Sequence, residues 1–67
     1  MSSQSDFYVA RAAHERAAAA KADLVNVRDN HLRAAAAWDV LAARSLKSDR
    51  LRVAEEERKA EIKALQY

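Results

Sequence analysis

Apolar residues recur at steps of three or four along the first third of the chain, and this spacing predicts one face of a helix. The positions on this face are Phe7, Ala10, Ala13, Ala17, Ala20 and Leu24. Ser3 or Ser5 can cap the helix, and Asp6 then lies in the first turn, where a carboxylate stabilises the positive end of the helix dipole. We therefore predict a helix over about residues 5–23.

The helical spacing falters between Asp23 and Asn26, and a second pattern begins after it. Asn26 followed by Asp29 has the form of a helix cap with an acidic residue three positions on. The second helix is predicted over about residues 27–47, and one of its faces consists of His31, Ala34, Trp38, Leu41, Ala42 and Ser45. A helical hairpin with its turn near residues 24–26 follows, and a single kinked helix is the alternative because no glycine or proline marks the turn.

Trp38 is a large ring among alanines, and the predicted hairpin suggests where it lies. Residues equidistant from a hairpin turn meet, so Trp38 is expected beside Ala10 and Ala13, and Leu41 beside Phe7. The ring would then fill the volume that the opposing alanines leave open, as interdigitated layers require.

A second apolar strip on the same helix has no partner within a two-helix hairpin. Its members are Leu32, Ala35, Ala36, Ala43 and Leu46, interrupted only by Asp39. A second copy of the hairpin would cover this strip in a four-helix bundle, and the C-terminal segment would cover it in a three-helix bundle.

From Ser48 onward the chain is strongly charged, and pairs such as Glu55 with Lys59 are spaced to stabilise a helix. Ser48 can cap a separate third helix, but nothing between Arg44 and Arg52 demands a break. We therefore favour a helical extension over about residues 48–66 that continues the second helix.

The predicted fold is all-α, an antiparallel two-helix hairpin with a charged C-terminal helical extension, in one domain of residues 1–67; a three-helix bundle is the alternative. The chain has no Gly, Pro or Cys, and alanine makes up 17 of its 34 hydrophobic residues, so its core is thin. Disulfides are excluded. We therefore expect added stability from a homo-oligomer, such as a dimer, or from a docked partner helix.

No residue pattern predicts catalysis, a cofactor or a metal. His14 and Glu15 begin like a helical zinc-protease motif, but Ala18 stands where the second histidine would share the metal. The carboxylates at 55–57 are consecutive, so they fan around a helix and do not converge. We predict a non-enzyme with no catalytic, cofactor-binding or metal-binding residues and no small-molecule substrate.

Lysine and arginine number 12 against 10 acidic residues, for a net charge of +2. Five basic side chains could contact phosphate: Arg33, Arg44, Lys47, Arg50 and Arg52. No aromatic residues interleave with them, so an ordinary solvated face is preferred and nucleic-acid binding is the alternative. The sequence has neither a signal-peptide pattern nor an apolar run that could span a bilayer, so we expect a cytoplasmic protein without a membrane partner.

Spaced residues between Phe7 and Leu46 carry a resemblance. They read Y-x-x-R-A, a short turn, then V-R-x-x-x-L-x-x-A-x-x-W-x-x-L-A-x-R, beginning at Tyr8 and at Val27. In this the chain resembles a group of short uncharacterised alphaproteobacterial proteins, which often carry a proline in the turn, where this chain has Asp23 to Asn26. The resemblance implies a helical hairpin and brings no activity, cofactor or catalytic residue.

The function predicted from these observations is a protein–protein interaction module that self-associates or docks a partner helix. The residues predicted to form its core and interaction surface are Phe7, Leu24, Leu32, Trp38, Leu41 and Leu46.

Overall fold

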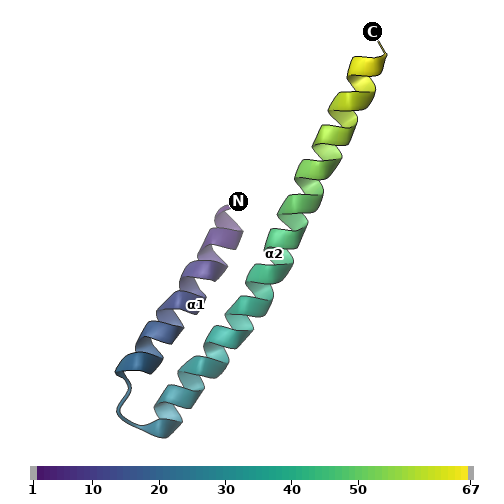
Figure 1. Ribbon diagram of the computed structural model, residues 1–67. Helices are drawn as coiled ribbons and strands as arrows, with labels where there is room; N and C mark the ends of the chain where they lie inside the picture. The colour runs from purple at the N-terminus through teal and green to yellow at the C-terminus, as the bar shows by residue number, and fades with distance from the viewer. Residues whose placement is uncertain (1, 67) are drawn as a thin grey trace.

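Two helices joined by a short turn make up the fold. The computed structural model describes residues 2–66, in which α1 spans Ser3–Lys21 and α2 spans Val25–Leu65. The 19-residue α1 folds back along the first half of the 41-residue α2, and the second half of α2 continues alone (Figure 1). The predicted all-α antiparallel hairpin with a helical extension is confirmed, and its alternatives, a single kinked helix and a three-helix bundle, are wrong.

The helix ends differ slightly from the prediction. Ser2 caps α1, because its Oγ accepts a hydrogen bond from the Ser5 amide at 3.1 Å, so the predicted caps Ser3 and Ser5 both lie inside the helix. Leu24 precedes α2 in an extended conformation (φ −94°, ψ 133°) and offers no side-chain cap. The turn is therefore complete before Asn26, which lies in the first turn of α2 and not at its cap.

Small residues form the contact between the helices. Ala12 and Ala19 on α1 and Ala35 and Ala42 on α2 are buried, and we call these four residues the alanine seam. The two alanines on each helix are seven residues apart, which is the repeat of a coiled coil. Alanine at these positions lets helix backbones approach toward the close end of the usual range, about 8 Å.

On α1 the predicted face is wrong. Ala10, Ala13, Ala17 and Ala20 are all exposed, whereas Ser5 is fully buried at the head of the true face. Because alanine occurs on several sides of α1, counting apolar residues does not separate one face from another, and Ser5 weakens the pattern on the side that is buried. On α2 the prediction holds for five positions: Ala42 is buried and His31, Ala34, Trp38 and Ser45 are partly buried, while Leu41 is exposed. The prediction is wrong for Ala35, which the sequence pattern assigns to the strip without a partner in the hairpin but which is only 2% exposed.

Beyond Asp49, α2 has no helix packed against it within the described chain. Every described residue from Arg50 onward is exposed, and we call residues 50–65 the tail. The helix runs through Ser48 without a break, as the absence of glycine and proline favours. Within residues 2–66 no helix is both long and apolar enough to cross a membrane.

Candidate interaction surface

Trp38 lies in an aromatic cluster at the side of the hairpin. Its ring packs edge-to-face against Phe7, with centroids 5.7 Å apart and planes at 86°, and lies 5.9 Å from the ring of Tyr8. The Arg11 guanidinium carbon is 5.5 Å from the Trp38 ring centroid, within reach of a cation–π interaction. The prediction that Trp38 packs against Ala10 and Ala13 is therefore wrong, because Phe7 and Tyr8 lie opposite the indole.

Ser2, Ser5, Ser45 and Asp49 form a polar cluster at the open end of the hairpin. The Ser5 hydroxyl donates to Asp49 Oδ2 at 2.6 Å, and its oxygen lies 2.6 Å from that of Ser45. The Ser2 backbone amide also donates to Asp49 Oδ2, at 3.1 Å. These bonds from Ser5 and Ser2 hold the pKa of Asp49 below its usual value, because they favour the charged carboxylate. The cluster joins the start of α1 to the middle of α2.

Glu15 forms a second polar link across the two helices. Its Oε2 lies 2.7 Å from Nδ1 of His31 on α2, and its Oε1 lies 3.1 Å from the Arg11 guanidinium on the same helix. The hydrogen bond with His31 is the main reason why the pKa of Glu15 is lowered. Arg16 pairs with Asp39 on the outer side of the hairpin. These links, together with the polar cluster at the open end, specify the alignment of α1 on α2.

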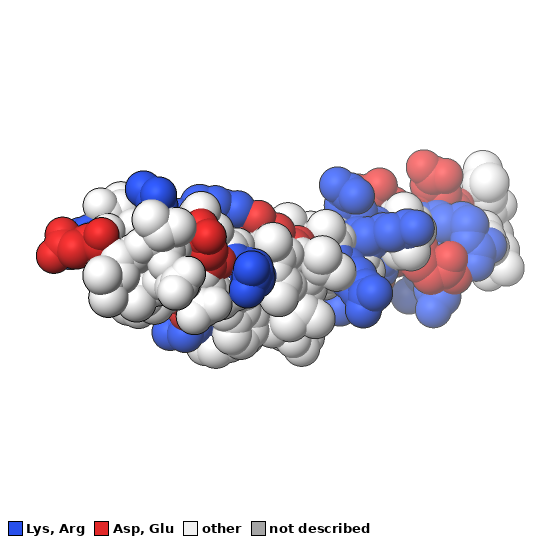
Figure 2. Space-filling model, turned by 90° about the horizontal axis from the view of Figure 1, so that it is seen from below, with Lys and Arg blue, Asp and Glu red and all other residues white. Residues whose placement is uncertain are grey.

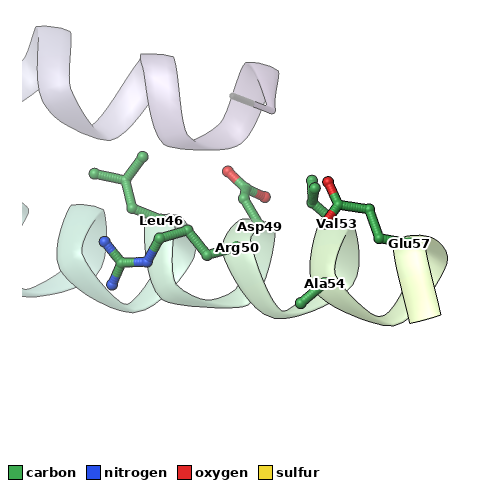
Figure 3. Close-up of a pocket in the computed structure, with 6 residues that line it drawn as sticks. All are labelled: Leu46, Asp49, Arg50, Val53, Ala54 and Glu57. Atoms are coloured by element: carbon green, nitrogen blue, oxygen red, sulfur yellow. The ribbon is translucent and has the colours of Figure 1, made fainter.

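An open groove of about 390 Å³ lies beside the N-terminal end of α1, where the tail begins. Figure 3 shows Leu46 and Asp49 pointing toward α1 and Val53 lying beyond the N-terminal end of α1. The other lining residues are Arg50, Ala54 and Glu57. The groove therefore combines an apolar floor with charges of both signs, and no described part of the chain fills it.

The predicted interaction residues do not gather in one place. Phe7, Leu24, Leu32 and Leu41 are exposed, whereas Trp38 and Leu46 are partly buried. The aromatic cluster unites only Phe7 and Trp38, Leu24 lies in the turn, and Leu46 borders the groove.

The tail carries exposed apolar side chains that are not among the predicted interaction residues. Leu51, Val53, Ile62 and Leu65 are all exposed, with Leu65 at 86%. Leu51, Ile62 and Leu65 share one side of the helix with Ala54, where Arg58 interrupts the apolar pattern, and Val53 lies on a different side. Ser5, Glu15 and Asp49 were missed as well, because polar residues in a helix contact carry no hydrophobic signal.

The five basic residues do not form a single basic face. Arg33, Arg44, Lys47, Arg50 and Arg52 are all exposed. Arg52 lies 3.4 Å from Asp49 Oδ1, and farther along the tail Arg58 pairs with Glu55. Figure 2 shows acidic and basic side chains interleaved over the tail, whereas the face of the hairpin seen in this view is mostly uncharged. Such mixing weakens the attraction for a phosphate backbone.

Among residues 2–66 there is no group of three or more His, Cys, Asp or Glu side chains that could hold a metal ion. No protein-family model matches the chain, and neither a curated protein nor a solved structure matches it.

Proposed function

We propose that this protein is a non-enzymatic protein–protein interaction module that presents the tail of α2 to another helix, either in a second copy of the chain or in a different protein. We also propose that the protein acts in the cytoplasm. The chain has no cysteine, and proteins of that compartment rarely contain disulfides. The resemblance to short alphaproteobacterial hairpin proteins is part of the same proposal and adds no activity to it.

The observation that carries the proposal is the unpaired tail. Its 16 residues are helical, yet all are exposed, including Leu51, Val53 and Leu65. Most helices in proteins gain stability by packing an apolar face. A partner helix would supply that packing at the groove, where Leu46, Val53 and Ala54 lie together.

Photo-crosslinking tests the proposal in cells that make the protein. A benzophenone amino acid replaces Ala54, which lines the groove at the start of the tail, or Ala13, an exposed alanine of α1 that serves as the matched control. Irradiation is expected to give a discrete adduct from position 54 and none from position 13. If position 54 gives no more adduct than position 13, nothing covers the groove and the proposal is wrong.

Nucleic-acid binding is the alternative function, and it depends on the five exposed basic residues. The carboxylates that interleave with them argue against it, because they repel the same phosphates that the basic residues attract.

A further inference from the structure

A line of apolar side chains runs along α2 and extends past the N-terminal end of α1. Leu46, Val53 and Ala60 are seven residues apart and therefore share one face of the helix. Ala54 lines the groove together with Leu46 and Val53 (Figure 3). Val53 is 53% exposed, so this line is still open to a partner.

Only the first residue of this line, Leu46, points toward α1 (Figure 3), and the line does not continue the alanine seam. The face of α2 that meets α1 passes through Ala35, Ala42 and Asp49, and the next positions at the same spacing are Glu56 and Lys63. Charged side chains at these positions end the alanine seam. A partner for the tail is therefore expected on the neighbouring face, where it leaves α1 in place.

Four charged residues flank the apolar line in a definite order. Lys47 and Arg50 lie seven and four residues before Ala54, and Glu57 and Glu61 lie three and seven residues after it. All four are exposed, and none forms an ion pair with any residue in the range 2–66. These four charges are basic on one side of Ala54 and acidic on the other, so they are complementary to the same four charges turned end for end.

Resting on the proposed function, we propose that the partner helix is the tail of a second copy of this chain, running antiparallel and centred near Ala54. Lys47 of each copy then lies opposite Glu61 of the other, and Arg50 of each lies opposite Glu57 of the other. A parallel copy in register would place like charges together, which is unfavourable. The two-fold symmetric arrangement is also the commonest one for soluble homo-oligomers.

The contact is short, and this sets its strength. Residues 46–61 span about 24 Å of helix, which places the interface at the small end of specific contacts. Exposed ion pairs contribute little affinity, so the apolar line supplies the attraction and the charges select the antiparallel orientation. The dimer is expected to be weak, detectable at high micromolar concentration, and weaker in high salt.

Charge reversal tests the pairing in the full-length chain by sedimentation equilibrium. The K47E/R50E variant makes the whole strip acidic, and the E57K/E61K variant makes it basic, so each is expected to self-associate about tenfold or more weakly than the unaltered chain. An equimolar mixture of the two variants restores opposite charges across the contact and is expected to associate. The matched control is R44E, which reverses a charge outside the strip and leaves self-association unchanged.

Introduced cysteines test the orientation, because the chain has no native cysteine. Under mild oxidation, A54C is expected to give a disulfide-linked dimer, since residue 54 lies near the two-fold axis. A64C is expected to give none, because the two copies of residue 64 lie about 30 Å apart in the antiparallel arrangement, far beyond disulfide reach. Equal linkage at both positions would indicate a parallel dimer and overturn the proposal.

The remaining outcomes separate this inference from the proposed function. If the unaltered chain stays monomeric at high micromolar concentration, or if the charge variants associate as it does, the antiparallel tail contact is wrong. The photo-adduct at position 54 then decides the proposed function independently: an adduct with another protein retains it, and no adduct refutes it.

Discussion

Trp38→Ala tests how much the aromatic cluster contributes to the hairpin. Removing a fully buried tryptophan costs about 3–5 kcal/mol. The Trp38 ring is only partly buried, and its edge-to-face partner Phe7 is 53% exposed, so we expect a smaller loss of about 2–3 kcal/mol. For a chain of 67 residues, whose total stability is on the order of 3–10 kcal/mol, this is a large fraction.

Urea unfolding followed by far-ultraviolet circular dichroism measures this loss, at one low protein concentration so that association does not contribute. A matched Phe7→Ala variant and the double variant complete a double-mutant cycle. The coupling between the two rings is expected at about 0.5–1.5 kcal/mol. A Trp38→Ala loss below about 0.5 kcal/mol, or a coupling of zero, would refute the reasoning, because such values are those of an unpacked surface side chain.

Other predictions address the seam, the polar links and the basic residues. Ala12→Leu should destabilise the hairpin by about 1–3 kcal/mol, because Ala12 is only 2% exposed. Ala13→Leu, on the exposed side of α1, should be nearly neutral. Equal urea midpoints for the two variants would contradict the packing of Ala12 in the alanine seam. The pKa values of Asp49 and Glu15 are lowered in the folded chain, so both ionised carboxylates stabilise the fold. This stabilisation is complete above the ordinary carboxyl pKa range, about pH 4, and is lost as the pH falls through the lowered pKa values of the folded chain. The urea midpoint should therefore fall on acidification, and the E15Q/D49N variant should show a flatter profile; parallel profiles would contradict the role of these carboxylates. A fluorescent DNA duplex should not bind even at low ionic strength, where phosphate contacts are strongest, and salt-sensitive binding would favour the nucleic-acid alternative.

The hairpin and its extension could be predicted because they depend on local signals. The loss of helical spacing after Asp23 placed the turn within a few residues of its position at 22–24, and the lack of a breaking residue near Ser48 predicted one continuous second helix. Both features are decided by residues close together in the chain.

The contact between the helices could not be predicted in the same way. Its face on α1 begins with Ser5, a polar residue that can be buried there because its hydroxyl donates a hydrogen bond to the Asp49 carboxylate and shares another with the Ser45 hydroxyl. These hydrogen bonds join residues 40 and 44 positions apart, so they depend on the alignment of the helices. The predicted neighbours of Trp38 were wrong for the same reason. A small shift in the alignment of the helices places Phe7 and Tyr8, in place of alanines, opposite the Trp38 ring.

The distance between spin labels at positions 4 and 48 tests most directly whether α1 folds back onto α2. Gln4 and Ser48 are both exposed and border one groove near the open end of the hairpin, so label replacement leaves the seam intact. Pulsed electron paramagnetic resonance, with excess unlabelled chain to dilute any dimer, is expected to give a distance below about 20 Å, since helices packed together lie about 8–10 Å apart. A single continuous rod would instead separate the labels by about 66 Å, and that result would contradict the hairpin and every contact described across it.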